Sequence, residues 1–599
     1  MLRQIACLVA AAASLAAAGE YRLFDPSAVP ATGDPSVAVV SVAKPARVQR
    51  LDCPVVIAGG GVGGVAAALA AVREGVRACL TEPTRWLGGQ MTAQAVSALD
   101  ENQWIEGAGA ARSYQDLRRR IRSAYGGRPN PGACWVSRLC FEPAAGVRVL
   151  DDLLAPHVKS GLVRVMLRTV PVEARRERGT ISVLRTYSFE TRTFTDLRGR
   201  VFIDATELGD LLPMAGASFR TGAESRAETG EPDAPAVADP GAIQSFTYPF
   251  VLSRGDAGGI PFSKPAAYEQ LSAQYSFRID YGGGKVLEYG MYDHREGTPG
   301  PFWTYRRLIA AEGADLAMIN WPGNDACNPG YISEDPLTAA RAFQYGKQVA
   351  LGFAWWLKHE APNAGGRGFA DLVLRGDVLG SADGLSLYPY IREARRMAAL
   401  TTVREQDVAE PWQAGARARA YNDTAGIGFY PLDIHGCREP KPLPRAKPYQ
   451  IPFGALISRE IPNLLAGAKN LGVTHITNGA YREHPTEWAI GEAVGTLAAA
   501  AVRALRHPAE IYRDPQRLRA VQLRLLAAGH PLVWFDDVTP AHPAFAAIQE
   551  AALNGLMPPA EDSLHFRPDD MVTGEEAKGL PAPIRRADFA RRLSGRTID

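Results

Sequence analysis

The segment Pro54 to Gly64, PVVIAGGGVGG, constrains the fold more than any other part of the chain. A short apolar run, Val55 to Ala58, leads into the glycines, and an alanine-rich run, Val65 to Val72, follows them. This order predicts a strand, a tight turn and a helix. Such a unit binds a dinucleotide by placing its pyrophosphate at the N-terminus of the helix.

Three of these glycines are expected to have separate tasks. Gly59 permits the turn, Gly61 lets a pyrophosphate approach the backbone, and Gly64 lets helix and strand pack closely. A second apolar run ends in Glu82, about twenty residues further on, where a carboxylate can accept hydrogen bonds from an adenosine ribose. Glycine clusters also occur in ordinary loops, but the glycines and Glu82 together indicate a dinucleotide site.

The composition is that of a globular protein. The chain has 599 residues, of which 46% are hydrophobic and 22% charged. This length suggests about three to four compact units, or one large composite domain with a small appendage. The formal charge of +2 and the lack of a basic cluster interleaved with aromatic residues predict no nucleic-acid partner. No cysteine or histidine spacing resembles a zinc or iron-sulfur site, so no metal is predicted.

The N-terminus has the layout of a cleavable secretory signal. Arg3 precedes an apolar stretch from Ile5 to Ala17, and small residues stand before Gly19. The apolar stretch is too short to span a bilayer, and no later segment is long and apolar enough. We therefore expect residues 1–18 to be a signal peptide, no transmembrane segment, and export to the periplasm or the extracellular space.

Export would bring the cysteines of the mature chain into an oxidising compartment. Cys53 and Cys79 lie in predicted core strands and are expected to be inert thiols. Cys134 and Cys140, in CWVSRLC, are expected to pair with each other or with a distant cysteine. Both alternatives stay open because the sequence alone does not determine which cysteines are joined.

The rest of the chain suggests how the domains are arranged. Residues 19–50 show no periodicity and are predicted to be a linker. β-rich runs between Gly161 and Ala205 predict a β-meander that returns to the parallel sheet, and Asn463 to Gly467 predict its last strand. A helix from Trp488 to Leu505, opened by Gly491, is expected to follow. The predicted divisions are a dinucleotide-binding domain in two parts, residues 51–235 and 401–510, a substrate domain of residues 236–400, and a C-terminal module of residues 520–599.

Four pieces in chain order carry a family resemblance: GGGVGG, then Glu82 with LGGQ, then IDATELGD, then NLLAGAKNLG followed by GEAVG. With them the chain resembles the flavin-dependent oxidoreductases of the glutathione-reductase-like FAD superfamily, and more narrowly the FAD-dependent oxidoreductases labelled "xanthan lyase-like". The matching stretches span most of residues 53 to 506. The implied fold is α/β: a Rossmann-type FAD-binding domain with a β-meander, an inserted α+β substrate domain and a small C-terminal helical module.

The resemblance implies FAD as the cofactor, and it also implies where the cofactor lies. It places Gly59, Gly61, Gly63 and Gly64 at the pyrophosphate, Glu82 at the ribose and Val170 at the adenine. Gly88, Gly89 and Gln90 are placed at the start of the isoalloxazine region, and Asp204, Thr206 and Asp210 near the ribityl–pyrophosphate side. Gly467 and the helix from near Gly491 are placed at the ribityl chain and the flavin pyrimidine. The partial positive charge of a helix N-terminus would stabilise anionic reduced flavin there.

No second strand–glycine–helix unit follows Glu82, so no nicotinamide nucleotide is predicted. The flavin is expected to be reduced by the substrate, a small molecule or a carbohydrate, and reoxidised by oxygen, a quinone or a protein carrier. Hydride transfer to N5 requires a base for the substrate's O–H or N–H proton. The candidates are His484, His475, His435 and Glu487, although a structural role beside the cofactor is equally expected for His475 and His484.

Two further segments leave alternatives open. Arg392 and Arg395, in YIREARRM, could clamp a carboxylate or sugar hydroxyls, but a helix whose arginines pair with Glu393 or face solvent is favoured. Residues 534–577 resemble a single surface-layer-homology repeat, which predicts a small helical module with at most weak contact to cell-wall glycan. Competing functions are a flavin-containing glycan lyase or isomerase, and a wall-associated binding protein with vestigial FAD.

Overall fold

The computed structural model describes residues 19–255, 259–281, 284–309, 315–437, 442–574 and 582–594. The predicted signal peptide, residues 1–18, and the last residues of the surface-layer-like segment lie outside these ranges.

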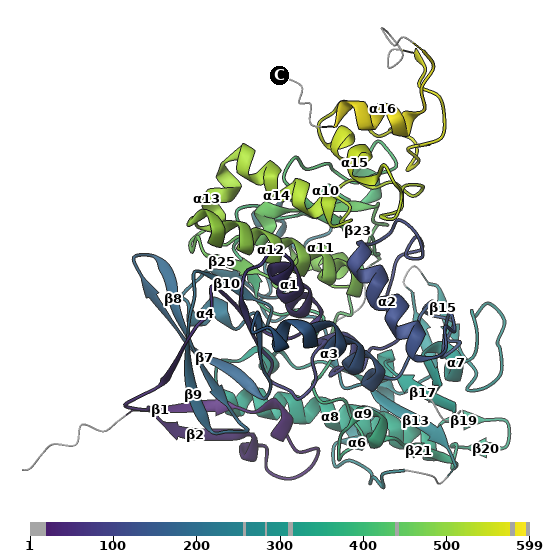
Figure 1. Cartoon of the computed structure of the whole chain (residues 1–599). Helices are drawn as coiled ribbons and strands as arrows, with labels where there is room; N and C mark the ends of the chain where they lie inside the picture. The colour runs from purple at the N-terminus through teal and green to yellow at the C-terminus, as the bar shows by residue number, and fades with distance from the viewer. Residues whose placement is uncertain are drawn as a thin grey trace, which may run out of the picture.

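The predicted dinucleotide unit forms as β4 (Val55–Ala58), α1 (Val62–Arg73) and β5 (Ala78–Thr81). Five parallel strands make the central sheet in the order β25-β10-β4-β5-β6, completed by β6 (Val163–Met166), β10 (Val201–Asp204) and β25 (Leu464–Ala466). Strands β4, β5, β10 and β25 are buried throughout, as expected for parallel strands covered on both faces. The predicted α/β fold is confirmed (Figure 1).

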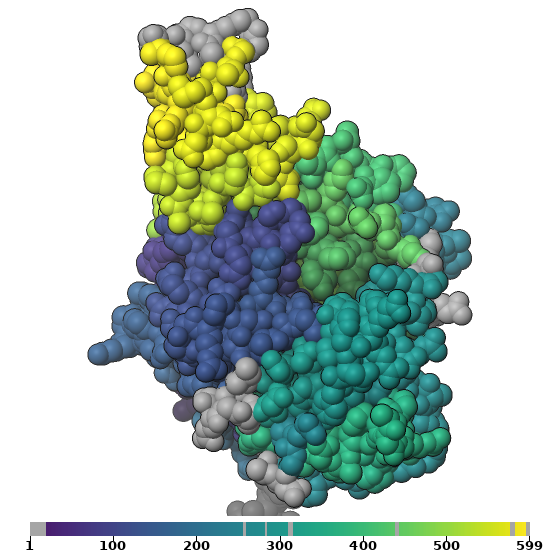
Figure 2. Space-filling view, turned by 90° about the vertical axis from the view of Figure 1, so that its right-hand side faces the viewer, coloured from purple at the N-terminus to yellow at the C-terminus, as the bar shows by residue number. Residues whose placement is uncertain are grey.

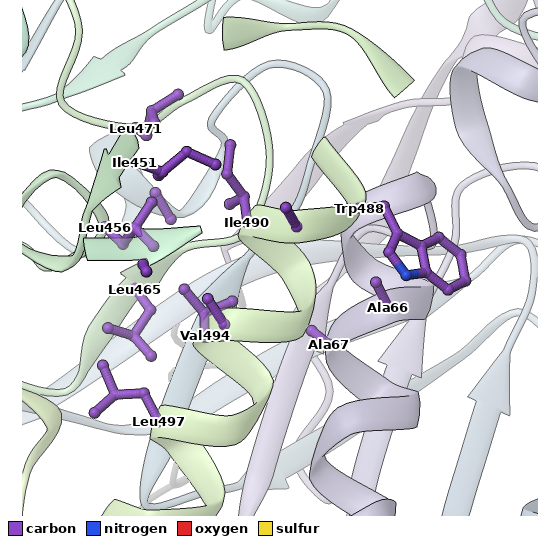
Figure 3. Close-up of a cluster of buried hydrophobic side chains, with 14 of the residues drawn as sticks. Ala66, Ala67, Ile451, Leu456, Leu465, Leu471, Trp488, Ile490, Val494 and Leu497 are labelled. Carbon is purple, nitrogen blue, oxygen red and sulfur yellow. The ribbon is translucent and has the colours of Figure 1, made fainter. Parts of the chain in front are cut away.

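Helix α1 packs against α12 (His484–Ala504) through glycines. A Cβ atom at Gly491 would lie 2.1 Å from the carbonyl oxygen of Gly63, and one at Gly495 would lie 2.3 Å from that of Ala67. The expected helix start near Gly491 was wrong: α12 begins at His484, with Pro485 in its first turn. Gly491 therefore serves helix packing. Figure 3 shows Val494 and Leu497 of α12 pointing toward Leu465 of β25, with Ala67 of α1 on the helix's other side.

A second, four-stranded sheet has the order β3-β9-β8-β7. It consists of β3 (Gln49–Asp52), β7 (Thr169–Glu177), β8 (Thr180–Ser188) and β9 (Thr193–Arg198), and β7 was not among the predicted strands. The other elements of this half are α2 (Arg112–Ala124), α3 (Pro143–Lys159), α4 (Leu211–Met214), β11 (Phe219–Arg220), α5 (Arg226–Thr229), β22 (Arg396–Met397), α10 (Glu405–Val408), β23 (Thr424–Gly428), β24 (Tyr449–Pro452) and α11 (His475–Tyr481).

Residues 19–50 were predicted to be a linker, and the structure corrects this. They contain strands β1 (Glu20–Phe24) and β2 (Val39–Ala43), which pair antiparallel as a hairpin, and the edge strand β3. Leu23 is buried beside Tyr187 and Phe194 of the β-meander. Strands β1 and β2 are five residues each and are separated by a long connection, so the segment shows no sustained period.

The inserted region has its own antiparallel sheet, ordered β16-β17-β13-β21, covered by α8 (Pro336–His359). The strands are β13 (Phe250–Arg254), β16 (Arg307–Ile309), β17 (Asp315–Ile319) and β21 (Leu372–Leu374). Its shorter elements are β12 (Phe246–Thr247), α6 (Tyr268–Leu271), β14 (Arg278–Asp280), β15 (Val286–Glu288), α7 (Phe302–Tyr305), β18 (Asp325–Ala326), β19 (Pro362–Asn363), β20 (Gly366–Arg367) and α9 (Gly376–Leu379). An aromatic core of its own holds this region together, and the predicted boundaries between domains stay predictions.

The C-terminal segment forms α13 (Pro508–Arg513), α14 (Pro515–Ala527), α15 (Phe545–Leu553) and α16 (Arg586–Leu593). It lies at one end of the molecule and packs on the half that carries the parallel sheet (Figure 2). Phe545 and Ile548 belong to the same hydrophobic core as β4 and α1. Among the residues that the structure describes, no helix is both long and apolar enough to cross a membrane.

Three disulfides join Cys53 to Cys79, Cys134 to Cys140, and Cys327 to Cys437. The first corrects the expectation of inert thiols. Cys79 lies in β5 and Cys53 just precedes β4, so the pairing of these strands brings the two cysteines together. Of the alternatives for Cys134 and Cys140, the structure has the pair with each other.

Candidate active site

A cavity of about 340 Å³ opens at the carboxyl ends of β4, β5 and β10. In a sheet of this topology a dinucleotide binds at that edge. Of the residues predicted at the cofactor, those that line the cavity are Gly59, Gly61, Glu82, Gly89, Val170, Thr206 and Asp210. Unpredicted lining residues include Leu23, Phe24, Gln94, Glu207, Tyr388 and Arg395.

The glycine turn leads into the N-terminus of α1, whose backbone N–H groups can donate to an anionic oxygen. Gly59 has a φ of +98°, and a Cβ atom there would lie 2.0 Å from the carbonyl oxygen of Ala205. Gly61 caps α1 without a side chain, and the Gly63 N–H donates to Glu487 Oε1 at 3.2 Å. The carboxylate of Glu487 thus lies at the positive end of α1, where a phosphate is also favoured.

Glu82 sits at the end of β5, as the spacing predicted. Its Oε2 accepts from the Gly60 N–H at 3.0 Å, and its Oε1 accepts from the backbone N–H of Thr84 at 2.9 Å. Burial raises the pKa of Glu82 to about 7, and the hydrogen bonds from Thr84 only partly offset this. The residue is therefore poised between its charged and neutral forms at neutral pH.

Several buried acceptors around the cavity have no hydrogen-bond partner among the described residues: Gln90 Oε1, Gln94 Oε1, Glu207 Oε1 and Asn470 Oδ1. A buried acceptor without a donor is costly, so a ligand that supplies donors would stabilise these groups. Lys469 Nζ pairs with Glu207 and lies 3.6 Å from Glu487 Oε2. These unpaired acceptors, Lys469 and the N-terminus of α1 together fit a ligand that carries both hydroxyl groups and phosphates, such as a dinucleotide.

The other predicted cofactor residues do not line this cavity. Asp204 accepts hydrogen bonds from Thr206 and Leu211, and it therefore shapes the turn after β10. Gly64 and Gly467 approach neighbouring backbone, at Gly59 and Asp204 respectively. Gly88 takes a φ of +105°, and Gln90 Nε2 donates to Glu487. Asp204 thus holds the turn and Gly491 packs against α1, and the predicted closeness of both to the cofactor stays a prediction.

His484 is fully buried, and backbone groups use both of its ring nitrogens. Nδ1 accepts from the Asp100 N–H at 3.2 Å, so Nε2 donates to the carbonyl of Val96 at 3.1 Å. Burial lowers its pKa to about 4. His484 has no free nitrogen for a substrate proton, which contradicts its choice as the base.

His475, predicted as a base or as a structural residue beside the cofactor, is the first residue of α11. Its Nδ1 lies 2.8 Å from Glu393 Oε2. It lines a different cavity of about 330 Å³, together with Glu224, Ile434 and Leu443. Burial, with the charge of Arg396, lowers its pKa to about 4. The helix turns this side chain away from the first cavity.

His435 is the remaining histidine candidate, and it lies between two carboxylates. Its Nδ1 is 2.9 Å from Asp325 Oδ2, and its Nε2 is 3.2 Å from Asp433 Oδ2. Burial and the charge of Arg392 lower its pKa, but the two carboxylates outweigh them, and the pKa of His435 is raised. The side chains of His435 and Asp433 are 30% and 38% exposed, so a small molecule can reach them.

Two buried arginines hold these carboxylates. Arg392 Nη2 lies 3.0 Å from Asp325 Oδ1, and Arg482 Nη2 lies 2.9 Å from Asp433 Oδ2. The segment YIREARRM is not a helix, because its arginines are drawn inward by separate carboxylates; Arg395, for example, pairs with Asp210 at 3.3 Å. The favoured expectation, a helix whose arginines pair with Glu393 or face solvent, was therefore wrong for Arg392 and Arg395, although Arg396 of the same segment does pair with Glu393. We call His435, Asp325, Asp433, Arg392, Arg482 and Tyr390 the His435 cluster.

Arg482 joins the two sites. Its carbonyl accepts from Gln90 Nε2 at 3.2 Å, and its Nη1 donates to the Tyr390 hydroxyl at 2.7 Å. The Cys327–Cys437 disulfide ties the loop of Asp325 to the loop of His435. A proton acceptor and a set of polar groups are thus held beside the residues that follow the Gly88–Gly89 turn.

Sequence reasoning missed several residues of these sites: Gln94, Glu207, Asp325, Asp433, Lys469 and Asn470. Glu207, Lys469 and Asn470 stand inside stretches used for the family resemblance, which was their only signal. Asp325 follows no spacing rule, since its partners Arg392 and His435 lie far away in the sequence. Asp433 stands only two residues before its partner His435, but it was not singled out.

The sequence model of the family described as "FAD dependent oxidoreductase" matches residues 54–525. No curated protein matches the chain. A geranylgeranyl bacteriochlorophyll reductase-like protein from Thermoplasma acidophilum is 10% identical, with a TM-score of 0.33, over 91% of this chain and 99% of that one.

Two other solved structures match smaller parts of the chain. L-proline dehydrogenase from P. horikoshii is 15% identical, with a TM-score of 0.16, over 28% of this chain and 24% of that one. The flavin-dependent monooxygenase PieE, in complex with FAD and substrate, is 13% identical, with a TM-score of 0.21, over 34% of this chain and 35% of that one. The chain thus spans well under two thirds of the length of both.

Proposed function

Because the chain belongs to the FAD-dependent oxidoreductase family, we propose that it is an exported enzyme that oxidises a small polar molecule or a sugar without a nicotinamide cofactor. FAD, its cofactor, accepts a hydride from the substrate when bound. The chain's own residues must then bind and orient the substrate, and they must take up the proton that the substrate loses.

One observation supports this proposal more than any other: Arg482 connects the cofactor cavity to the His435 cluster. Its backbone holds Gln90, which directly follows the cavity residue Gly89, while its guanidinium holds Asp433. A substrate bound against Asp433 and His435 would be placed next to the residues that hold the cofactor. A merely structural ion-pair network would not need two members that are 30% and 38% exposed.

We assign the proton to His435, although both of its ring nitrogens have partners. Its Nε2 faces the part-exposed carboxylate of Asp433, so a substrate hydroxyl bound to that carboxylate can pass its proton to Nε2, a route that the buried backbone partners of His484 do not offer.

Asp325 orients the ring of His435 through Nδ1, and Arg392 in turn fixes Asp325. Burial alone would raise the pKa of Asp325, but the charge of Arg392 and the contact with His435 lower that pKa to about 2. Since the pKa of His435 is raised above its usual 6.5, the neutral, proton-accepting ring becomes populated at a higher pH than for an ordinary histidine. Substrate oxidation should therefore speed up as pH rises through that pKa.

The cluster also favours a substrate with several hydroxyl groups. A hydroxyl can donate to the carboxylate of Asp433 and accept from a guanidinium or from the hydroxyl of Tyr390. Sugars and sugar alcohols carry such groups next to an oxidisable C–H bond, and so do amino alcohols.

The test is an anaerobic screen of FAD-loaded protein against sugars, sugar alcohols, amines and simple alcohols, with flavin absorbance as the readout. We expect at least one class to bleach the flavin, and His435→Gln to bleach much more slowly with unchanged FAD content. Conversion of a glycan without bleaching would instead show a lyase or isomerase. If no class is oxidised or converted while FAD is bound, a binding protein with vestigial FAD is the better description.

Export and wall contact belong to the same proposal. The apolar leader of residues 5–17 supports export, and N-terminal sequencing of protein from the native host should find a mature chain that begins near Gly19. An intact Met1 would contradict export. For residues 534–577, which lie beyond the family match, we keep weak glycan contact as a proposal; co-sedimentation with isolated cell walls, compared with a chain that ends before residue 534, tests it.

A further inference from the structure

The hairpin of β1 and β2 forms one wall of the cofactor cavity. Leu23, Phe24 and Pro26 line it, and Gly61 and Glu82 also line it. Leu23 belongs to a small apolar cluster that includes Val170, a residue expected at the adenine. In Figure 1 the hairpin lies across the ends of β7 and β9 and beside α8. The part of the chain predicted to be a linker is thus placed where it covers the cofactor.

A buried ion pair holds the hairpin in place. Asp25 is only 6% exposed, and its two carboxylate oxygens accept from Arg168 Nη1 at 2.9 Å and from Arg168 Nη2 at 2.6 Å. Arg168 Nη1 also donates to the carbonyl of Pro83 at 3.2 Å. Pro83 directly follows Glu82, so the pair fastens the hairpin to the segment expected to hold the ribose.

The opposite side of the hairpin is anchored to α8. Lys347 Nζ donates to the carbonyl of Val29 at 2.8 Å, and the rings of Phe24 and Phe343 meet edge to face with centroids 5.0 Å apart. Arg22 pairs with Asp335 at 3.3 Å, where both side chains are about half exposed. The hairpin therefore bridges the β-meander and the inserted region over the cavity.

Strand β1 pairs with β2 alone, so the hairpin is a separate two-stranded sheet. Such a hairpin is only marginally stable by itself in water. Its docked position must therefore depend on its anchors, of which the Asp25–Arg168 pair is the bidentate ion pair. Its departure would break no strand pairing of the parallel sheet or the β-meander, but it would expose Val29 and Ala38, which are buried in the core of the inserted region.

We propose that residues 20–43 are the lid of the FAD site and that Asp25 and Arg168 are its latch. With the latch closed, FAD is enclosed between the glycine turn and the hairpin. The cofactor enters or leaves only when Asp25 releases Arg168 and the hairpin moves away. This inference rests on FAD binding alone and does not depend on the substrate proposed above.

Asp25→Ala tests the latch, with Asp34→Asn as the matched control, since Asp34 is an exposed residue of the same hairpin that does not line the cavity. FAD release is followed after dilution of the loaded protein, and FAD uptake after its addition to the FAD-free protein. We expect Asp25→Ala to release FAD at least about tenfold faster, because a bidentate arginine–carboxylate pair is a strong contact and tenfold corresponds to about 1.4 kcal/mol.

The rate of FAD uptake distinguishes a hairpin that opens as a lid from a hairpin that is only a fixed wall of the cavity. Opening a lid speeds both release and uptake, whereas loss of a direct contact speeds release only. Faster release with unchanged uptake would overturn the lid, and so would a folded variant with neither rate changed. Failure of the wild type to hold any FAD would instead overturn the cofactor assignment.

A measurement on the wild type decides the matter if Asp25→Ala does not fold. Hydrogen exchange of the β1 amides is compared between FAD-bound and FAD-free protein, with α16 as the internal reference. We expect FAD to slow exchange in β1 and β2 but not in α16. Equal exchange in the hairpin of both forms would overturn the proposal.

Discussion

The cofactor cavity and the His435 cluster are built in opposite ways. The cavity stands at the ends of three neighbouring strands, and its shape depends on glycines such as Gly59 and Gly61, whose missing side chains leave room. The His435 cluster draws its residues from four loops and helix ends up to 157 positions apart, from Asp325 to Arg482, and charge pairing holds it together. One site is specified by local steric rules and the other by long-range electrostatics.

The two sites also differ in what they lack. Around the cavity, several buried acceptors have no partner among the described residues, whereas the carboxylates of the cluster are paired with arginine and histidine. The cavity therefore needs a ligand that donates hydrogen bonds, whereas the carboxylates of the cluster already have partners and its unpaired buried atoms, within the described part of the chain, are donors, Nε of Arg392 and of Arg482. Substitutions should accordingly separate cofactor binding from chemistry.

The largest effect is expected at the glycine turn. Gly61 has a φ of −63°, which any residue can adopt, so Gly61→Val changes only the space available. Its Cβ atom alone would lie 3.0 Å from Glu207 Oε1, inside the cavity. We expect complete loss of FAD with an unchanged far-ultraviolet circular dichroism spectrum. Gly365→Val, at an exposed turn, is the control, and a yellow Gly61→Val protein would contradict the steric account.

The next effect should leave the cofactor in place and affect the chemistry. His435→Gln should keep FAD and slow flavin reduction by at least about a hundredfold, the lower end of general-base contributions. Asp325→Asn should move the rising limb of the pH–rate profile to lower pH, because it removes one of the groups that raise the pKa of His435. Stopped-flow absorbance measures both. Loss of FAD in His435→Gln would show that the two sites are not separable.

Glu82→Ala should have a smaller effect, and only on the cofactor. Losing a hydrogen bond to a charged group costs about 1–3 kcal/mol, which weakens FAD binding about 5- to 150-fold. Because the pKa of Glu82 is raised to about 7, the wild-type advantage over Glu82→Gln should shrink as pH falls below 7 and the carboxylate is protonated. Titration of FAD-free protein with FAD measures this. Equal affinities of Glu82→Ala and wild type would exclude the ribose contact.

The smallest effect is expected at His484, on stability rather than rate. Its folded-state pKa of about 4 lies below the usual 6.5, so the neutral ring stabilises the fold above pH 6.5, and this contribution is lost as pH falls toward 4. His484→Gln should unfold about 1–3 kcal/mol more easily at pH 7 and lose less stability on acidification than wild type. Denaturation curves at pH 7 and pH 4.5 test this. A hundredfold slower flavin reduction would restore His484 as a base.

The sequence by itself determined the dinucleotide unit and the family. Glycines at fixed spacing, an apolar strand on either side and Glu82 at the end of the second strand follow rules that act over some thirty residues, and such rules can be read along the chain. The same locality explains the predicted strand at Asn463 to Gly467, which forms as β25.

Only the tertiary structure decided which histidine is accessible, where Arg392 and Arg395 point, and that residues 20–43 cover the cofactor cavity. His484 and His435 stand in equally motif-rich segments. Backbone groups of a distant loop hydrogen-bond both ring nitrogens of His484, whereas two aspartates with arginine partners hold the ring of His435. Burial and charge pairing depend on neighbours brought together from distant parts of the chain. No local pattern records those neighbours, and they set each group's pKa and exposure.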